Sequence, residues 1–182
     1  MFRSLPQTRD WTPAYRLASV AAFTLITILA ARVSIPLEPV PFTLQPLAVL
    51  LAGMILGARD GMLSQLAYVA LIALNAPVDA RGQGAAALAG TTGGYLIGFA
   101  AAAFVAGWLV ERGGRRVWTR WLAGAAGVLV IYLCGVPWLK AVTGMTWEAA
   151  LAAGAGTFLL FDLAKAVIAA ALTEGGRRLL SR

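Results

Sequence analysis

The chain of 182 residues has no histidine and one cysteine, and each shortage excludes a class of function. Without histidine there is no histidine-based metal site and no acid–base catalysis centred on that residue. A single cysteine excludes a framework of disulfides. No GxxxxGK[ST] motif occurs, so the chain has no recognisable means of hydrolysing ATP itself. We therefore predict no catalytic residues, metal or cofactor, and any dependence on ATP would come from partner proteins.

Charge is also scarce, since only 13% of the residues are charged while 60% are apolar and the mean hydropathy is +0.78. About a quarter of the residues of soluble domains are charged, so the surroundings of this fold are lipid. A helix that crosses a bilayer needs about 20 largely apolar residues. We predict an all-α, polytopic membrane protein with one domain over residues 1–182. Its six transmembrane helices are expected at about 15–34, 46–58, 61–76, 91–111, 119–140 and 148–174.

The second and third of these helices are short for a full crossing. They either cross with little tilt or form a hairpin that is partly sunk into the membrane. Almost no sequence is left for a domain outside the membrane. Any activity must therefore lie in the bundle or in its loops.

The basic residues are distributed unevenly along the chain. With the N-terminus inside and six crossings, the outer loops hold only Arg32, Arg81 and Lys140. An excess of arginine in the cytoplasmic segments is the positive-inside pattern, so the net charge of +7 indicates topology and no nucleic-acid partner. No small-x-small cleavage site follows the N-terminal segment, so both termini are expected in the cytoplasm. The eleven cytoplasmic arginines are Arg3, Arg9, Arg16, Arg59, Arg112, Arg115, Arg116, Arg120, Arg177, Arg178 and Arg182.

Two irregular segments fall on the outer side. The first, over 35–46, has four prolines, and backbone so dense in proline cannot span lipid as a helix. The second, over 75–94, is rich in glycine and ends in Gly90-Thr91-Thr92-Gly93-Gly94. Irregular backbone at membrane depth is tolerated only where protein or a polar cavity covers it. Two such loops on one face predict a pocket with a lid.

Small residues recur at helical spacing on two of the expected helices. On the first helix, Ala14, Ala18 and Ala22 would let another helix approach closely, as helices do in lipid. This stripe either packs within the chain or forms a docking face for a partner. The second stripe is expected to pack within the chain and consists of Gly94, Gly98, Ala102 and Ala106.

Asp162 and Lys165 lie near the middle of the last helix. Each costs about 2.5–3.5 kcal/mol at the centre of a membrane helix, so their presence requires a partner or a function that offsets this cost. At positions i and i+3 they share a face and can pair. A bridge that only holds the bundle is one interpretation, but apolar packing could often replace it, which favours a ligand site. Such a pair within apolar walls could bind a small molecule with N–H donors, a carbonyl acceptor or a carboxylate.

Two other functions are conceivable for a chain with Asp162 inside a membrane helix. A stand-alone, proton-linked carrier is disfavoured, because a chain of 19.0 kDa is small for an inverted-repeat transporter and neither half repeats the other. An intramembrane enzyme is disfavoured more strongly. It would have a single inward carboxylate, with no histidine and no nearby serine to act with it.

Several blocks of the sequence together resemble a known family. VPFTLQPLAVLLAGMILGARDGMLSQLAYVAL, TTGGYLIGFAAAAFVAG and FDLAKAV are similar to the BioY family, the biotin-specific S components of energy-coupling factor (ECF) transporters. The resemblance covers about residues 15–175. It implies a six-helix bundle of ECF S-component type in a prokaryotic cell membrane, which captures biotin from outside. The implied partners are a transmembrane coupling (T) protein, which docks at Ala18 and Ala22, and two ABC-type ATPases.

The resemblance also implies roles for single residues. Asp162 is expected to accept the ureido N–H groups of biotin, and Lys165 to bind the ureido oxygen or the valerate carboxylate. Arg81 would bind the carboxylate at the outer mouth, unless it is a solvated charge. Further contacts or walls are expected from Asn75, Gln83, Thr43, Gln45 and Tyr95.

Two departures from the family pattern concern the second outer loop. GTTGG replaces the frequent GPTGG, which removes a stiffening proline. The segment Asn75-Ala76-Pro77-Val78-Asp79 replaces GLPVF, so an aromatic residue near the mouth is missing. These differences make the ligand-facing residues of this loop the least predictable part of the site.

Overall fold

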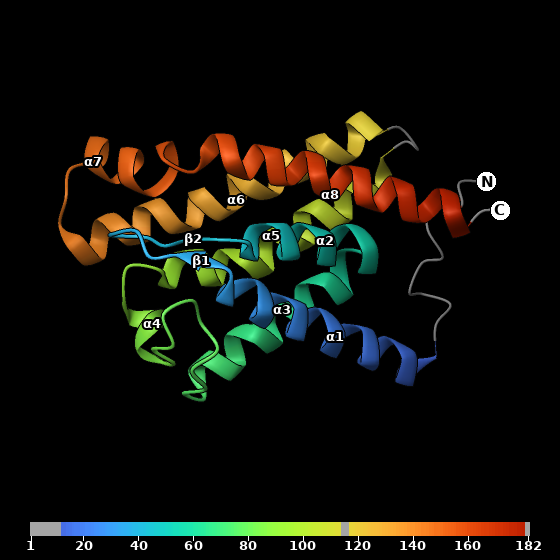
Figure 1. The fold of residues 1–182 in the computed structure, drawn as a ribbon, viewed down its shortest axis with the longest axis horizontal. Coiled ribbons are helices and arrows are strands. Elements are labelled where there is room, and N and C mark those ends of the chain that lie inside the picture. The colour runs from blue at the N-terminus through green and yellow to red at the C-terminus, as the bar shows by residue number, and fades with distance from the viewer. Residues whose placement is uncertain (1–11, 114–116, 181–182) are drawn as a thin grey trace.

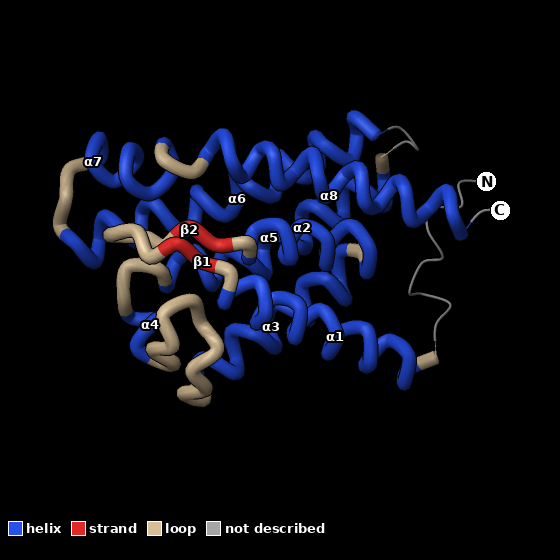
Figure 2. The backbone as a smooth tube through the Cα atoms, viewed as in Figure 1, coloured by secondary structure: helices blue, strands red, loops and turns tan. Residues whose placement is uncertain are grey.

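The computed structural model describes residues 12–113 and 117–180, with side chains to residue 176. Figures 1 and 2 show a bundle of helices in which β structure is confined, among the described residues, to one short antiparallel pair. The prediction of an all-α membrane bundle is confirmed. The elements are α1 (Pro13–Arg32), β1 (Ser34–Ile35), β2 (Phe42–Thr43), α2 (Gln45–Leu56), α3 (Ala58–Ala73), α4 (Ala86–Ala89), α5 (Gly93–Arg112), α6 (Val117–Thr143), α7 (Trp147–Leu151), the π-helix η2 (Ala152–Gly156) and α8 (Leu159–Leu180).

Four helical stretches within 12–113 and 117–180 are long and apolar enough to cross a membrane. They are α1, α5, α6 and the run Trp147–Gly176. Helix α2 has 12 residues and α3 has 16, so the count of six crossings stays a prediction. Leucines on several helices point outward, with Leu29 66% and Leu160 77% exposed, which is the surface that contact with lipid requires.

Glycines let α2, α3 and α5 cross at the centre of the bundle. A Cβ atom on Gly53 of α2 would lie 2.2 Å from the carbonyl oxygen of Ala103 in α5, and one on Gly61 of α3 would lie 2.7 Å from the Cα atom of Gly53. A Cβ atom on Gly107 would lie 2.5 Å from the backbone nitrogen of Ala58. The three helices therefore pack backbone against backbone, which is how helices associate where burial from water gives little drive.

The small-residue stripe of α5 packs within the chain as predicted. A Cβ atom on Gly94 would lie 2.5 Å from the carbonyl oxygen of Cys134 in α6. Ala102 and Ala106 further along α5 are completely buried. This stripe thus serves the close packing of α5 within the bundle.

Helix α1 is attached to α3 largely through polar side chains. The Arg16 guanidinium donates to both carboxylate oxygens of Asp60, at 2.6 and 2.9 Å. Further along both helices, the buried Gln65 Nε2 donates to Thr27 Oγ1 at 3.1 Å. Hydrogen bonds between helices are a recognised means of association in lipid. They fix α1 on one side of the bundle, as Figure 1 shows.

The alanine stripe of α1 faces away from the rest of the chain. Ala14, Ala18 and Ala22 are all exposed, whereas Thr27 and Ala31 on the other side of α1 are buried. The interpretation that this stripe packs within the chain is therefore wrong. The alternative interpretation, a docking face for a partner, stays a prediction.

The last membrane segment differs from the uninterrupted helix expected over 148–174. It is divided into α7, η2 and α8, with a turn at Thr157–Phe158 between η2 and α8. The interrupted part has the sequence AAGAG, in which two glycines lower the helix propensity, and π-turns occur often at functional sites. The break matters because α8 begins just before Asp162, whose N–H donates to the Phe158 carbonyl oxygen at 2.9 Å.

The two ends of the bundle carry different features. In Figure 1 the start of α1 and the α2–α3 junction lie toward one end, and the β1–β2 pair, α4 and the α6–α7 connection lie toward the other. Arg59 lies in the first turn of α3, Arg32 is the last residue of α1, Arg81 lies between α3 and α4, and Lys140 lies near the end of α6. Seven arginines of the topology prediction cannot be placed in this way. Five lie outside the described residues, namely Arg3, Arg9, Arg115, Arg116 and Arg182, and the side chains of Arg177 and Arg178 are not described.

Candidate ligand-binding site

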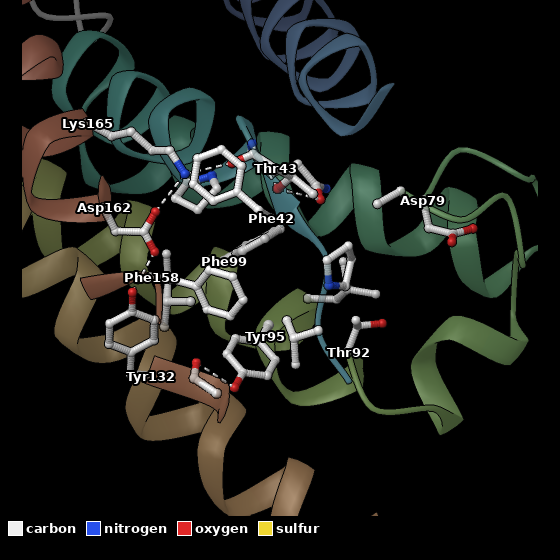
Figure 3. A pocket seen from close by; sticks show the side chains of 18 of the residues that line it. Phe42, Thr43, Asp79, Thr92, Tyr95, Phe99, Tyr132, Phe158, Asp162 and Lys165 are labelled. Carbon is white, nitrogen blue, oxygen red and sulfur yellow. Dashed lines mark hydrogen bonds and ion pairs between the residues drawn. The ribbon is translucent and has the colours of Figure 1, made fainter. Parts of the chain in front are cut away.

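A cavity lies at the end of the bundle that carries the two irregular loops. About 620 Å³ of space is free of protein atoms there, part of it open to the surroundings at the mouth. Figure 3 shows aromatic side chains around it and an ionic group on one side. The aromatic lining residues are Phe42, Tyr95, Phe99, Tyr132 and Phe158. The polar lining residues are Thr43, Gln45, Asp79, Arg81, Thr92, Asp162 and Lys165.

Asp162 and Lys165 form a buried ion pair in this lining. Lys165 Nζ lies 2.7 Å from Asp162 Oδ1, and only 4% and 5% of Asp162 and Lys165 are exposed. The same ammonium donates to the backbone oxygen of Thr43 at 2.7 Å and lies 4.0 Å from the centroid of the Phe42 ring. An ammonium has three N–H donors, so one remains to meet a carbonyl or carboxylate oxygen of a ligand.

Tyr132 completes the ionic group from α6. Its hydroxyl donates to Asp162 Oδ2 at 2.6 Å, so each carboxylate oxygen receives one donor from the protein (Figure 3). A carboxylate has about four acceptor positions, which leaves capacity for N–H groups of a ligand. Because the carboxylate is held from both sides, its orientation is set before a ligand arrives. The site thus offers an oriented acceptor beside an oriented donor.

Aromatic rings form the apolar part of the cavity. The rings of Phe42 and Phe158 stack with centroids 6.4 Å apart, and the ring of Phe161 meets Phe42 edge-on at 5.5 Å. The hydroxyl of Tyr95 donates to the Gly154 carbonyl oxygen in η2 at 2.9 Å, which joins α5 to the interrupted segment. These walls suit a ligand that is partly hydrophobic.

Arg81 lies at the cavity but is engaged with the first outer loop. Its guanidinium donates to the carbonyl oxygens of Leu37 and Pro39, both at 3.2 Å, and lies 3.1 Å from the Glu38 carboxylate. Thr91 of the second loop also donates to the Pro39 carbonyl oxygen, at 2.7 Å. The two predicted loops therefore meet over one cavity. The solvated-charge interpretation of Arg81 is wrong in this structure, because protein oxygens take up its guanidinium.

Asp79 lines the cavity at the position where the family pattern has an aromatic residue. Its carboxylate accepts the N–H groups of Arg81 and Gly84, at 3.0 and 2.8 Å, and so builds the turn of the second loop. In Figure 3 it lies apart from Asp162 and Lys165. The missing aromatic side chain is thus replaced by a residue that shapes the loop.

Six of the eight residues predicted to contact a ligand line this cavity. They are Asp162, Lys165, Arg81, Thr43, Gln45 and Tyr95. Asn75 and Gln83 are exposed and do not belong to its lining. The Asn75 side chain accepts the N–H of Ala85 at 3.2 Å, and its backbone φ of 66° fits a turn residue, so its role in this structure is to build the loop.

Sequence reasoning missed Tyr132 and the rings of Phe42, Phe99 and Phe158. Phe42 adjoins the predicted Thr43, and Phe158 lies four residues before Asp162, so spacing could have suggested both. Tyr132 had a weaker signal, as one of few hydroxyl groups within an apolar helix. Nothing in the local sequence of α6 indicates that it faces Asp162.

Comparison with known proteins places this arrangement in a family. The family model described as "BioY family" matches residues 5–182, which is nearly the whole chain. The chain belongs to the BioY family. Its membership and its four long apolar helices make it a multi-pass membrane protein.

The biotin transporter BioY of Thermotoga maritima is 42% identical over 157 residues, which cover 85% of this chain and 91% of that protein. The probable biotin transporter BioY of Pyrococcus horikoshii is 40% identical over 162 residues, or 88% of this chain and 95% of that one. A crystal structure of the S-component for biotin from an ECF-type ABC transporter matches with a TM-score of 0.83 and 26% identity. That match covers 93% of this chain and 92% of the solved one.

Proposed function

We propose that this chain is the biotin-binding S component of an ECF-type transporter and captures biotin from outside a prokaryotic cell. The observation that carries the proposal is the buried group of Asp162, Lys165 and Tyr132 at one side of an aromatic cavity, in a chain of the BioY family. A ureido ring presents N–H donors next to a carbonyl acceptor. The remainder of biotin is apolar except for its valerate carboxylate, which suits the aromatic walls.

Within this proposal, Asp162 accepts the ureido N–H groups and Lys165 donates to the ureido oxygen. The two side chains lie 2.7 Å apart, so one small group that carries both donors and an acceptor can meet them together. Assignment of Lys165 to the valerate is less favourable, because the carboxylate would then lie beside Asp162 and repel it. The valerate would extend toward the mouth, where Arg81 lies.

The remaining parts of the proposal concern energy and partners. The chain is a substrate-binding transport subunit and not an enzyme, so a coupling (T) protein and two ABC-type ATPases supply the work of ATP hydrolysis. The exposed face of Ala18 and Ala22 supports docking of the T protein there. Both termini lie in the cytoplasm in this arrangement, which places the cavity and its loops where the nutrient arrives.

Titration of the purified chain with biotin tests the ligand directly. We expect tight binding of one biotin per chain, and Asp162→Asn should raise the dissociation constant at least tenfold, about 1.4 kcal/mol. An amide keeps the size of the carboxylate but loses its charge and one acceptor. Asp60→Asn is the matched control, because Asp60 is equally buried but pairs with Arg16 at the far end of α1. It should leave the affinity within twofold, and absence of biotin binding by the wild type would contradict the proposal.

Docking of the partner is tested by enlarging the alanine face. The double variant Ala18→Leu/Ala22→Leu should bind biotin as the wild type does. The amount of T protein that co-purifies with it should fall at least tenfold. Larger side chains hold a partner helix away, while they cost nothing on a surface that touches only lipid. Ala101→Leu/Ala171→Leu is the control, since both alanines are exposed on other helices. Equal co-purification of the two double variants would rule out docking at this face.

Transport by the chain alone separates the proposal from the proton-linked carrier. Proteoliposomes that contain only this chain should not accumulate biotin, with or without a proton gradient. Accumulation that stops when the gradient is dissipated would favour the carrier instead.

A further inference from the structure

Tyr68 of α3 is completely buried and lies behind the cavity without lining it. Its hydroxyl accepts a hydrogen bond from Gln45 Nε2 at 2.7 Å and donates one to the carbonyl oxygen of Val78 at 3.3 Å. These two partners come from different segments, the start of α2 and the second outer loop. A buried hydroxyl that joins two segments next to a ligand cavity requires an explanation beyond packing.

The first partner leads to the ionic group of the cavity. Thr43 Oγ1 lies 3.3 Å from Gln45 Oε1, to which it donates, and the Thr43 backbone oxygen accepts the bond from Lys165. Hydrogen bonds therefore run without interruption from Lys165 in α8, through Thr43 and Gln45, to Tyr68. Thr43 and Gln45 both line the cavity, so this chain of bonds passes directly behind one of its walls.

The second partner leads to the other loop. Val78 precedes Asp79, whose carboxylate organises the turn up to Gly84 through two backbone N–H groups. Asp79, with Ala80 and Arg81, belongs to the cavity lining. The bond from Tyr68 to the Val78 oxygen thus holds the base of a second wall.

We propose that Tyr68 is a positioning residue that joins the two walls and thereby slows the escape of bound ligand. The inference rests on the proposed function. In this proposal the ligand leaves when the loops that carry the walls separate, and such a separation breaks the bonds of the Tyr68 hydroxyl. In a buried, apolar setting those bonds have no water to replace them, so their loss is costly.

The dissociation rate of biotin from Tyr68→Phe tests the proposal. Phenylalanine fills the same space and removes only the hydroxyl, so we expect dissociation about tenfold faster, with the association rate within twofold of the wild type. Variants of one site usually differ in dissociation more than in association. The rates would be measured on the purified full chain with labelled biotin and an unlabelled chase.

Thr27→Val is the matched control. It also removes a buried hydroxyl that bonds to α3, through Gln65, but at the α1–α3 contact and away from the cavity lining. Its dissociation rate should stay within twofold of the wild type. A Tyr68→Phe rate within twofold of the wild type, or a Thr27→Val rate raised as much, would overturn the proposal. Failure of the wild type to bind biotin would instead contradict the proposed function.

Hydrogen exchange of the wild type provides a second measurement, which decides the matter even if Tyr68→Phe does not fold. Because Tyr68 joins the two walls, biotin should slow the exchange of amides in 33–44 and in 76–84 by similar factors. In a folded Tyr68→Phe variant, the slowing over 76–84 should be reduced. Slowing of only one segment in the wild type would overturn the proposal.

Discussion

Lys165→Met should raise the dissociation constant for biotin at least a hundredfold, about 2.8 kcal/mol. The lysine pairs with Asp162 and bonds to the Thr43 backbone oxygen. In the proposed complex it also supplies a donor for the ligand. Methionine fills similar space but leaves Asp162, which is only 4% exposed, without its cation. The loss should exceed that of Asp162→Asn, because asparagine keeps an acceptor oxygen for the ligand, whereas methionine has no donor to replace the ammonium. Titration calorimetry of the purified variant would measure it.

The stability of Lys165→Met distinguishes binding from folding. Removal of one partner of a buried ion pair costs about 3–5 kcal/mol, so the apo variant should melt below the wild type. The double variant Asp162→Asn/Lys165→Met should recover much of that stability, because it removes both charges, yet it should not recover binding. Recovery of binding by the double variant would mean that the pair has only a structural role.

Lys140→Met provides the control for the same substitution outside the cavity. Lys140 lies near the end of α6, with its ammonium 5.2 Å from the centroid of the Trp147 ring. Its replacement should leave biotin affinity within twofold of the wild type. An equal loss in Lys140→Met and Lys165→Met would contradict a local role for Lys165.

Gly53→Ala should destabilise the bundle by about 3 kcal/mol or more, at the upper end of the cost of overpacking. The added Cβ would lie 2.2 Å from the Ala103 carbonyl oxygen, and that atom belongs to the backbone of α5 and cannot rotate away. Helices α2 and α5 would have to separate, which also disturbs the contact with Gly61 of α3. At about 2–4 °C for each kcal/mol, we expect the apo protein to melt roughly 6–12 °C lower.

Gly175→Ala is the matched control for this prediction. Gly175 lies in α8, and a Cβ atom there would meet nothing within 4 Å. Alanine has a higher helix propensity than glycine by up to about 1 kcal/mol, so the melting temperature should stay the same or rise. Melting of Gly53→Ala within 2 °C of the wild type would contradict the tight crossing of α2, α3 and α5.

Much of the frame follows from the sequence because lipid imposes simple requirements. Apolar runs of about 20 residues predict the long membrane helices, and proline or glycine in quantity predicts the segments between them. Asp162 and Lys165 stand out for the same reason, since charges within a membrane helix are costly. Their spacing also predicts that they pair, which the structure confirms.

The direction in which each side chain faces does not follow from the sequence in the same way. In water, a polar face and an apolar face distinguish the outside of a helix from its inside. In lipid both sides are apolar, so Tyr132 and Leu133 of α6 have no pattern around them that separates them. The structure buries Tyr132 against Asp162 and leaves Leu133 63% exposed.

The second outer loop shows the same limit for polar residues. Asn75, Arg81 and Gln83 are all candidates by residue type, yet only Arg81 lines the cavity. Its guanidinium is taken up by the first loop, a contact between residues more than 40 positions apart. No local rule of sequence predicts such a contact.

The sequence by itself thus determined that the chain is a bundle of membrane helices, which two segments between helices are irregular and which two charged residues form an ion pair. Tertiary structure alone decided the interruption before α8, the exposure of the alanine face of α1, the attachment of Tyr132 to Asp162 and the link through Tyr68. The physical reason is that helix formation in lipid is a local response to hydropathy. Orientation and hydrogen bonding between helices depend instead on how residues distant in sequence pack together.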